Sequence, residues 1–419
     1  MWYNERKKGR EREDHGMTEI ALLGFGVVGS GTAEVLTENR ALISARLGEE
    51  IDIRYILDLR DFPDHPLGDR VVHDFETILN DPEIRIVAEM MGGAHPAYDF
   101  TRAALEAGKS VVTSNKEVVA TYGAELLEIA REHGVFYLFE ASVGGGIPII
   151  RPLQNDLSSN RILSVDGILN GTTNFILTEM RQSGASFASA LADAQKRGYA
   201  EANPAADVEG LDAARKIVIL AALSFGVLLS PAKIPVTGIA ALTAEQTEVA
   251  EALGCAVRLI GHTERLGDRV LALVSPHLVP ASNPLCHVDG VYNGILVDGN
   301  MLGRAFFYGA GAGKLPTASA VVADILNAAA PGEPVRLPAW RVAEDGDYAP
   351  ADERRVRRCF VLSGCAACAE KTKPYFGYET CVVRPGSFAF LSRPMTDKEA
   401  AQALRDCTKP LLWTLPVLD

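Results

Sequence analysis

The run Gly24-Phe25-Gly26-Val27-Val28-Gly29 constrains the fold more than any other feature of this chain. It follows the apolar segment 20–23 and reads GxGxxG at a change from strand to helix. The first glycine allows a tight turn, the second lets the backbone approach a pyrophosphate, and the third lets the helix pack closely on the strand. Amides at the helix start then face the phosphates. Alone this pattern is a weak signal, but in this position it predicts a dinucleotide site.

Length and charge limit the classes of function. The 419 residues suffice for two or three domains at about 150 residues each. The formal net charge of −13 argues against a nucleic-acid partner, which requires a basic surface. No apolar run is long enough to span a bilayer, so we expect no membrane partner.

The first sixteen residues are highly charged and lack the apolar core of a signal peptide. Because Met17 directly precedes the first predicted strand, residues 1–16 are either a disordered tail or an artefact of an upstream start site. We therefore expect a cytoplasmic protein with reduced thiols. Five of the seven cysteines lie near the C-terminus. The alternative to free thiols is a zinc site made by four of them, although their spacing is irregular for such a site: Cys359, Cys365, Cys368 and Cys381.

Strand and helix patterns alternate in the first part of the chain. Strands are predicted at 51–57, 84–91, 110–113 and 135–140, with helices at 97–107 and 116–132. This alternation predicts an α/β domain with a doubly wound parallel sheet over residues 17–140. Ligands of such sheets bind at the carboxyl ends of the strands, where Gly92, Gly93 and Ser114 fall.

The pattern changes after three consecutive glycines at 144–146. Strands are predicted at 162–168, 257–260, 270–274 and 305–308, and helices near 175–182, 187–197 and 212–223. Residues 141–308 therefore read as an α+β domain with a mixed sheet. A helix at 316–327 is expected to return to the first domain, residues 331–352 read as a linker, and 353–419 as a small C-terminal segment.

Two lysines are candidates for chemistry. Lys116 stands at a helix N-terminus, where the dipole disfavours a cation, so it is either a solvated lysine or a functional one. Lys216 follows Asp212 by four residues on one helix face that continues with apolar side chains. A desolvated lysine suits acid–base work, and the alternative is a structural ion pair. Glu201, Asp207 and Asp212 either bind an ammonium group or are ordinary solvated acids.

At this point the chain resembles homoserine dehydrogenase. The resemblance runs in order from residue 20 to about residue 327 and rests on eight segments: Gly24-Phe25-Gly26-Val27-Val28-Gly29, Thr113-Ser114-Asn115-Lys116, Glu140-Ala141-Ser142-Val143-Gly144-Gly145-Gly146-Ile147-Pro148, Leu169-Asn170-Gly171-Thr172-Thr173-Asn174-Phe175-Ile176-Leu177, Gly198-Tyr199-Ala200-Glu201, Gly210-Leu211-Asp212-Ala213-Ala214-Arg215-Lys216, Tyr308-Gly309-Ala310-Gly311-Ala312-Gly313 and Pro316-Thr317-Ala318-Ser319-Ala320-Val321-Val322.

The resemblance implies the interconversion of L-homoserine and L-aspartate 4-semialdehyde with NAD or NADP, a step in making threonine, methionine and isoleucine. It implies that Lys216 is the acid–base lysine and that Lys116 lies at the junction of nicotinamide and substrate. It further implies that Glu201 binds the substrate ammonium, that Asp212 is an acidic partner of substrate and Lys216, and that Asp207 supports them.

The same resemblance implies a Rossmann-type nucleotide domain and a monovalent cation, usually sodium, held by main-chain carbonyls at Glu140, Val143, Gly145 and Ile147. We assign cofactor binding to the glycine turn and to Arg60, Gly92, Gly93, Ser114, Lys116 and Gly311. Cofactor choice stays open, because Asp58 favours NAD through a ribose hydroxyl and Arg60 favours NADP through a 2′-phosphate, with NADP slightly preferred.

Many members of this family carry a C-terminal ACT domain that senses threonine. Here the expected turn after 358–362 is missing, so residues 353–419 are predicted to be a short, degenerate ACT-like segment, and threonine feedback is left open. A homodimer through the second domain is expected by similarity. Two alternatives remain: a catalytically silent nucleotide sensor on the same fold, and another oxidoreductase acting on a related amino acid.

Overall fold

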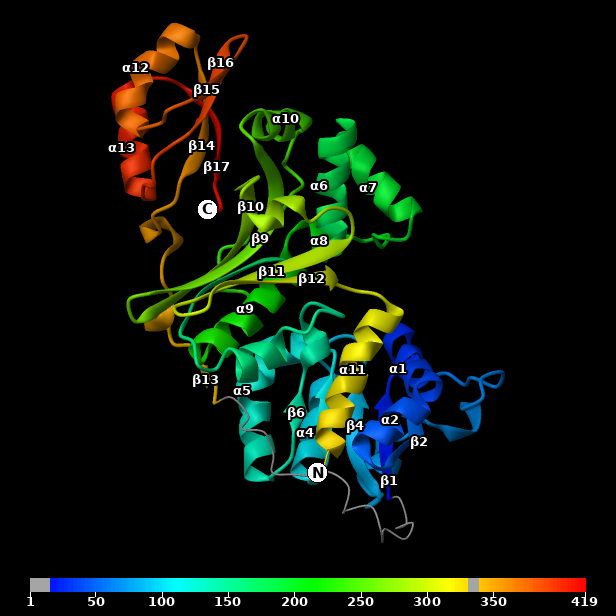
Figure 1. Cartoon of the computed structure of the whole chain (residues 1–419). Helices are drawn as coiled ribbons and strands as arrows, with labels where there is room; N and C mark the ends of the chain where they lie inside the picture. Colours follow the sequence, from blue (N-terminus) through cyan, green and yellow to red (C-terminus); the bar gives the residue numbers. More distant parts are fainter. Residues whose placement is uncertain (1–15, 331–338) are drawn as a thin grey trace, which may run out of the picture. The chain divides into compact units, whose positions relative to one another are not determined.

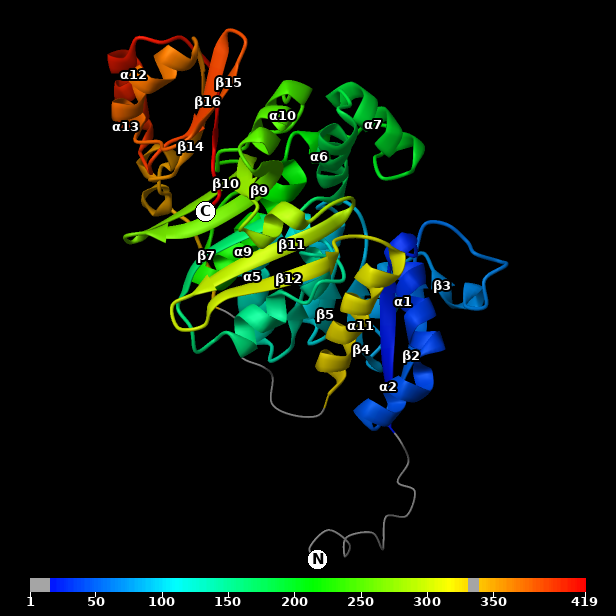
Figure 2. The same ribbon diagram turned by 45° about the horizontal axis from the view of Figure 1, so that its top comes forward.

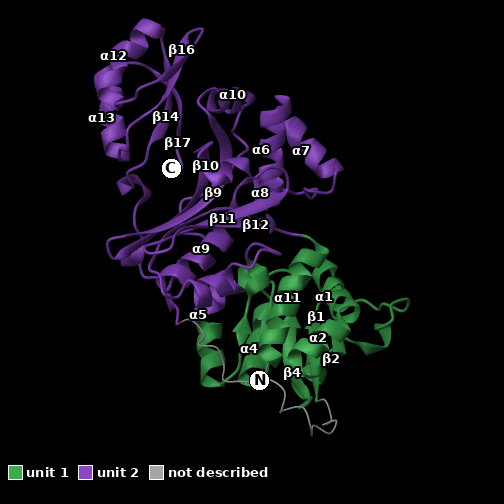
Figure 3. Cartoon of the chain, in the orientation of Figure 1, with its two compact units in different colours: residues 1–118, 125–142, 313–337 green, residues 119–124, 143–312, 338–419 purple. Residues whose placement is uncertain are grey.

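The computed structural model describes residues 16–330 and 339–419, which Figures 1 and 2 show in two views. The described chain divides into two compact units (Figure 3). Unit 1 holds described residues up to 118 together with 125–142 and 313–330, and unit 2 holds 119–124, 143–312 and 339–419. The predicted leader, apart from Gly16, and residues 331–338 of the predicted linker lie outside the described residues. Within the described residues, no helix is both long and apolar enough to cross a membrane.

Unit 1 contains a six-stranded parallel sheet in the order β3-β2-β1-β4-β5-β6. Its strands are β1 (Met17–Leu23), β2 (Glu50–Leu57), β3 (Val71–Val72), β4 (Ile84–Glu89), β5 (Ser110–Thr113) and β6 (Tyr137–Leu138). Strand order reverses between β1 and β4, which makes the carboxyl ends of these two strands the expected place for a dinucleotide. This is the predicted Rossmann-type doubly wound fold.

The helices of this unit are α1 (Val27–Glu38), α2 (Arg40–Leu47), α3 (Phe75–Leu79), α4 (Ala97–Glu106), α11 (Lys314–Ala329) and most of α5 (Lys116–Glu132), whose residues 119–124 belong to unit 2. α11 packs against α1, where a Cβ on Gly31 would lie 2.9 Å from the carbonyl oxygen of Lys314. The predicted last strand, 135–140, is shorter in the structure. Its end turns into a 3-10 helix, Glu140–Ser142, because the Glu140 amide donates to Asp324 Oδ2 at 2.7 Å instead of to a strand.

Unit 2 contains a five-stranded sheet in the order β10-β9-β7-β11-β12, made of β7 (Ile162–Ile168), β9 (Cys255–Leu266), β10 (Arg269–Pro280), β11 (Tyr292–Gly299) and β12 (Gly303–Ala310). Its helices are α6 (Gly171–Ser183), α7 (Phe187–Lys196), α8 (Ala205–Val208), α9 (Leu211–Phe225) and α10 (Ala244–Ala252). α9 is buried over most of its length and packs on β7, β9 and β10.

Three features of unit 2 differ from the sequence prediction. The strands of the five-stranded sheet pair antiparallel throughout, not in a mixed arrangement. β11 is missing from the prediction, since its apolar core is only three residues long between Asn-Gly and Asp-Gly. The predicted linker contains a short strand, β13 (Arg341–Val342), which pairs in parallel with β8 (Val227–Leu228).

The C-terminal segment is a complete βαββαβ unit rather than the degenerate segment that the sequence predicts. It runs β14 (Arg358–Ser363), α12 (Ala366–Phe376), β15 (Cys381–Arg384), β16 (Ser387–Leu391), α13 (Asp397–Cys407) and β17 (Leu411–Pro416). The sheet order β15-β16-β14-β17 is that of a ferredoxin-like unit. Figure 2 shows both helices on one side of this sheet, and buried phenylalanines 360, 376, 388 and 390 fill the space between. The sequence prediction relied on the absence of one turn motif, whereas the unit is stabilised by aromatic packing between segments that are distant in the chain.

Candidate active site

The glycine turn has the geometry that its sequence predicts. Gly24 directly follows β1 with φ +88°, and its amide donates to the Leu57 carbonyl at 2.8 Å. A Cβ on Gly29 would lie 2.1 Å from the carbonyl oxygen of Gly24, so this position admits only glycine. A Cβ on Gly26 would meet nothing within 4 Å. The packing of the protein therefore requires Gly29, whereas Gly26 leaves open space beside the start of α1.

Asp58 and Arg60 lie beside this turn, directly after β2. The Phe25 amide donates to Asp58 Oδ2 at 2.8 Å, and Arg60 Nε donates to Asp58 Oδ1 at 3.0 Å. The pKa of Asp58 is lowered to about 2, chiefly by the hydrogen bond from the Arg60 side chain. The Phe25 and Arg60 amides lower it further, whereas burial opposes the shift. The Arg60 side chain remains 62% exposed, whereas that of Asp58 is 10% exposed. Asp58 thus holds the glycine turn, and Arg60 is the accessible cation next to it.

Glu89, a residue that sequence reasoning missed, organises the neighbouring loops at the ends of β4 and β5. It is fully buried, and its two carboxyl oxygens accept from the Met91 amide at 2.7 Å and from Thr113 Oγ1 at 2.6 Å. Thr113 Oγ1 in turn accepts from the Asn115 amide at 2.9 Å. Burial raises the pKa of Glu89 to about 7, although these hydrogen bonds oppose the shift. The available sequence signal was an acidic residue inside the apolar run 86–91, three positions before the first of two glycines.

The loops held by Glu89 carry Gly92, Gly93, Ser114 and Lys116, all predicted to bind the cofactor. Gly92 and Gly93 are exposed, and the Gly93 carbonyl accepts from Asn115 Nδ2 at 2.7 Å. Asn115 Oδ1 also caps α5 by accepting from the amides of Glu117 and Val118. Lys116 begins α5 and is half-buried. One asparagine therefore ties the diglycine loop to the helix start that presents Lys116.

Lys216 lies in unit 2, in the second turn of α9. Its Nζ donates to Asp212 Oδ2 at 2.8 Å and to the Leu169 carbonyl at 2.7 Å. Lys216 and Asp212 are 8% and 6% exposed. An ammonium group has three N–H donors, so these two bonds fix the lysine and leave one donor direction for a ligand. The i,i+4 spacing predicted the ion pair, whereas the carbonyl partner comes from the end of a distant strand.

Asn170 links the acidic residues of this group, a role that sequence reasoning did not assign. Its Nδ2 donates to Asp207 Oδ1 at 2.7 Å and to Asp212 Oδ2 at 2.9 Å, while its Oδ1 caps α6 by accepting from the Thr173 amide. The structure thereby brings together Asp207, Asp212 and Lys216. Glu201 stands apart in the exposed loop before α8, where its carbonyl accepts from Gln195 Nε2 at 3.1 Å.

The residues predicted to hold a cation lie in a largely buried segment. Glu140 belongs to unit 1, and Val143, Gly145 and Ile147 belong to unit 2, all four with little exposure. Gly145 has φ +56°, and a Cβ there would lie 2.5 Å from the Gly311 carbonyl, so Gly311 packs on this segment in unit 2. Clusters of three or more acidic, histidine or cysteine side chains suited to a metal do not occur in 16–330 and 339–419. Any cation here would depend on main-chain oxygens, a donor set that suits a monovalent ion.

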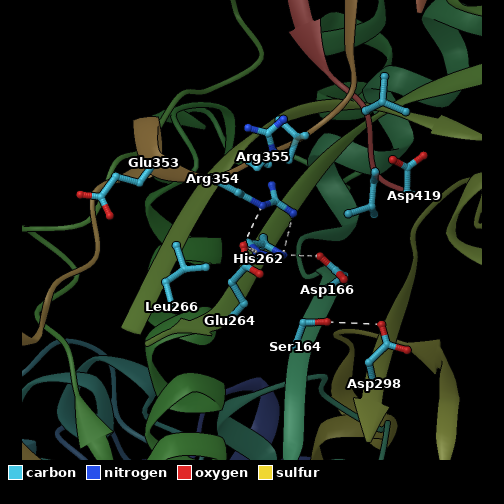
Figure 4. Close-up of a pocket in the computed structure, with 13 residues that line it drawn as sticks. Ser164, Asp166, His262, Glu264, Leu266, Asp298, Glu353, Arg354, Arg355 and Asp419 are labelled. Atoms are coloured by element: carbon cyan, nitrogen blue, oxygen red, sulfur yellow. Dashed lines mark hydrogen bonds and ion pairs between the residues drawn. The ribbon is translucent and has the colours of Figure 1, made fainter. Parts of the chain in front are cut away.

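A separate cavity of about 500 Å³ in unit 2 contains none of these residues (Figure 4). Its charges pair with one another: His262 contacts Asp166 at 2.6 Å and Glu264 at 3.2 Å, and Arg354 donates to Glu264 at 2.9 Å. Burial opposes the charged form of Asp166, yet His262 and Arg354 bring the pKa of Asp166 below its usual value. Because these charges are paired with one another, we interpret them as structural contacts that join the five-stranded sheet to residues 353–356 and 417–419.

Comparison with known proteins decides the family. The family model described as "Homoserine dehydrogenase" matches residues 148–326, and the model of its NAD binding domain matches residues 24–140. The chain belongs to the homoserine dehydrogenase family. The homoserine dehydrogenase of Synechocystis sp. is 45% identical over 316 residues, covering 74% of this chain and 72% of that protein. That of Neisseria gonorrhoeae is 45% identical over 313 residues with the same coverage.

Solved structures of homoserine dehydrogenases have the same fold as this chain. A homoserine dehydrogenase from Thiobacillus denitrificans superposes with a TM-score of 0.87 at 34% identity, covering 97% of this chain and all of that one. A homoserine dehydrogenase from S. aureus gives a TM-score of 0.79 at 33% identity, covering 96% and 99%. The protein is an NAD(P)-dependent oxidoreductase that interconverts L-homoserine and L-aspartate 4-semialdehyde, as the resemblance implied. Nothing in these comparisons favours the silent-sensor alternative.

Proposed function

We propose that Lys216 is the acid–base residue of homoserine oxidation. The observation that carries this role is its burial with Asp212 and the Leu169 carbonyl, which leaves one donor direction of Nζ for the substrate oxygen. As base, Nζ accepts the proton of the substrate hydroxyl, and as acid it returns a proton to the carbonyl oxygen. The nicotinamide supplies the hydride chemistry when it is bound. Asp212 orients the lysine and balances its charge when it is protonated.

The substrate contacts follow from the same group. Asp207 and Asp212 are held together by Asn170, and they present carboxylate oxygens that favour an ammonium group. Glu201 is the third carboxylate that we assign to the substrate ammonium, and its loop position leaves it accessible. Lys116 is assigned to the nicotinamide end of the cofactor, since it begins α5 at the carboxyl edge of the parallel sheet.

The test is NADPH formation from L-homoserine by Lys216→Ala. Turnover should fall about 10²–10⁴-fold, the usual contribution of a positioned acid or base, while cofactor affinity is unchanged. The matched control is Lys196→Ala, which removes an exposed lysine from α7 in the same unit. Turnover of Lys216→Ala within threefold of the control would refute the assignment.

We propose NADP as the preferred cofactor. Asp58 is fully engaged by the Phe25 amide and by Arg60, so a ribose hydroxyl would have to displace existing bonds. The exposed guanidinium of Arg60 is suited to bind a 2′-phosphate. A hyperthermophilic archaeal homoserine dehydrogenase, 28% identical, has been solved in complex with NADPH, which supports a cofactor of this type.

The discriminating measurement is kcat/KM for NADP and for NAD in Arg60→Ala. The ratio should move toward NAD by at least tenfold, because the variant loses the phosphate contact and releases Asp58 for a ribose hydroxyl. Arg46→Ala, which removes an exposed arginine from α2, should leave the ratio unchanged. An unchanged ratio in Arg60→Ala would contradict the NADP proposal.

We propose that a monovalent cation, sodium by similarity, is bound by main-chain oxygens of Glu140, Val143, Gly145 and Ile147. Support comes from the burial of this segment and the positive φ of Gly144 and Gly145, which turns its carbonyls sharply. Titration with NaCl against choline chloride at constant ionic strength should raise activity and the unfolding temperature in a saturable way. A response that depends only on ionic strength would contradict a specific site.

We propose that the protein is a homodimer through the sheet of unit 2. Three aromatic side chains on β11 and β12 are exposed by 40–53%: Tyr292, Phe306 and Tyr308. The rings of Tyr292 and Tyr308 stack with centroids 5.3 Å apart, and they form an apolar surface that a second copy would cover. Sedimentation should give a dimer, and Phe306→Asp with Tyr308→Asp should give a monomer.

We also propose that the protein is cytoplasmic. The observation in support is that all seven cysteines are free thiols in the structure, which is typical of a reducing compartment. Fractionation of the native host should recover the activity with cytosolic marker enzymes.

A further inference from the structure

A CxxC motif occupies the N-terminus of α12 in the βαββαβ unit, and the reaction described above does not use it. Cys365 is the N-cap residue and is exposed, and Cys368 lies in the first turn of the helix. Their Sγ atoms are 3.5 Å apart. The Cys368 amide donates to the Cys365 carbonyl at 2.9 Å, so the backbone holds the two residues at this spacing.

The surroundings of Cys368 favour its thiolate. The backbone N–H of Cys365 is the main cause that lowers the pKa of the Cys368 thiol, followed by the Cys365 side chain, and Lys409 adds to the effect. The helix N-terminus stabilises negative charge at the same place. Gly364 approaches so closely that a Cβ there would lie 2.8 Å from Cys368 Cβ, so the backbone leaves no room on that side.

Four of the other five cysteines are buried. Cys255 and Cys359 are buried, and burial raises the pKa of the Cys255 thiol to about 11 and that of Cys359 further. Cys286 and Cys407 are also buried. Cys365, Cys368 and the partly exposed Cys381 are therefore the accessible thiols, and among these the Sγ atoms of Cys365 and Cys368 lie 3.5 Å apart.

The zinc alternative from the sequence lacks ligands. Across the described chain, no cluster of three or more cysteine, histidine or acidic side chains is placed to bind a metal. A structural zinc site needs four such ligands. Two thiols at a helix N-terminus with 3.5 Å between the sulfurs are instead arranged to bond with each other.

We propose that Cys365 and Cys368 form a redox-active dithiol site, which is oxidised to an intramolecular disulfide by exchange with low-molecular-weight disulfides. The Cys368 thiolate attacks one sulfur of the incoming disulfide, forms a mixed disulfide and releases one thiolate. Cys365, as thiolate, then attacks the Cys368 sulfur and releases the second thiolate. The pair loses two electrons, the small disulfide gains them, and the two cysteine protons leave on the two released thiols.

Little movement separates the two states. A disulfide needs about 2.05 Å between the sulfurs, and Cys365 precedes the helix, so its side chain can turn toward Cys368 without unwinding α12. The inference does not depend on the assignments of Lys216 or Arg60, because these lie outside the βαββαβ unit.

The experiment uses the full-length protein in buffers with a graded ratio of reduced to oxidised glutathione. Free thiols are trapped with N-ethylmaleimide after denaturation, and peptides are identified by mass spectrometry. The expected result is a Cys365–Cys368 disulfide that appears at a defined potential, with Cys255 and Cys359 still alkylated. Persistence of both thiols in excess oxidised glutathione, stable glutathione adducts on both residues, or stoichiometric zinc on the reduced pair would overturn the proposal.

A second measurement tests the thiolate. In the reduced protein, Cys368 should react with iodoacetamide several-fold faster than Cys407, and Lys409→Met should slow it several-fold. The matched control is Lys398→Met, which removes an exposed lysine from α13. In Cys365→Ser, the mixed disulfide on Cys368 should accumulate, since the resolving thiol is gone. Equal rates in the two lysine variants, or no adduct in Cys365→Ser, would contradict the mechanism.

Discussion

Replacing Glu89 with glutamine should remove a pH-dependent loss of stability from unit 1. Glu89 is fully buried, and burial is the largest cause that raises its pKa to about 7 from the ordinary 4.5. The groups that face it are the Met91 amide, Thr113 and the Asn115 side chain, with Tyr137 near enough that Glu89 helps raise the pKa of that phenol. Glutamine is neutral at every pH and stands in for the protonated acid.

The sign follows from the direction of the shift. Because the folded pKa is raised, the folded state binds the proton more tightly than the unfolded state. The stabilisation is fully present below pH 4.5 and is lost as the pH rises through about 7. A move from 4.5 to about 7 corresponds to about 3 kcal/mol, of which about 2.5 kcal/mol is lost between pH 5 and pH 8.5.

The assay is calorimetric unfolding of wild type and Glu89→Gln at pH 5, 6.5 and 8.5, followed for the transition of unit 1. Subtracting the free energy of unfolding of the variant from that of wild type removes the contributions of all other titrating groups. Relative to the variant, wild type should lose about 2.5 kcal/mol from pH 5 to 8.5, or roughly 5–10 °C in the transition temperature. Glu132→Gln, an exposed glutamate at the end of α5, is the matched control and should show no such trend.

The result that refutes this reasoning is a difference between wild type and Glu89→Gln that stays constant from pH 5 to pH 8.5. It would mean that Glu89 is ionised in the folded protein at an ordinary pKa, and that water or another charge compensates its burial.

Two further predictions concern the two units separately. Gly29→Ala should destabilise unit 1 and weaken NADP binding, because its Cβ meets the Gly24 carbonyl at 2.1 Å. Gly26→Ala should fold with normal stability and still lose NADP affinity, because its Cβ meets no protein atom within 4 Å. Calorimetry measures the stability of both variants, and fluorescence titration measures their NADP affinity. Normal NADP affinity in Gly26→Ala would contradict the placement of the pyrophosphate. Asn170→Ala should cost about 1 kcal/mol as a lost helix cap and also raise KM for homoserine at least tenfold, since Asp207 and Asp212 lose their shared donor. Ser186→Ala, which removes only the cap of α7, should lower stability without changing KM.

The sequence by itself determined what depends on local chemistry. The strand at 110–113 and the helix at 116–132 have the predicted bounds, because a short β-branched run, the capping Asn115 and the glycine at 134 act within a few residues. The glycine turn is equally local, since steric limits on backbone approach depend on the turn itself. The pairing of Lys216 with Asp212 followed from helical spacing alone.

Tertiary structure decided what depends on residues far apart in the chain. Glu89 meets Thr113 across two strands, and Asn170 meets Asp207 and Asp212 from the end of another strand, so no local pattern identifies these partners. The same holds for β11 and for the complete βαββαβ unit, whose strands are stabilised by pairing and by aromatic packing with distant segments. Periodicity reports which face of an element is apolar, but only the folded chain determines which side chains that face meets.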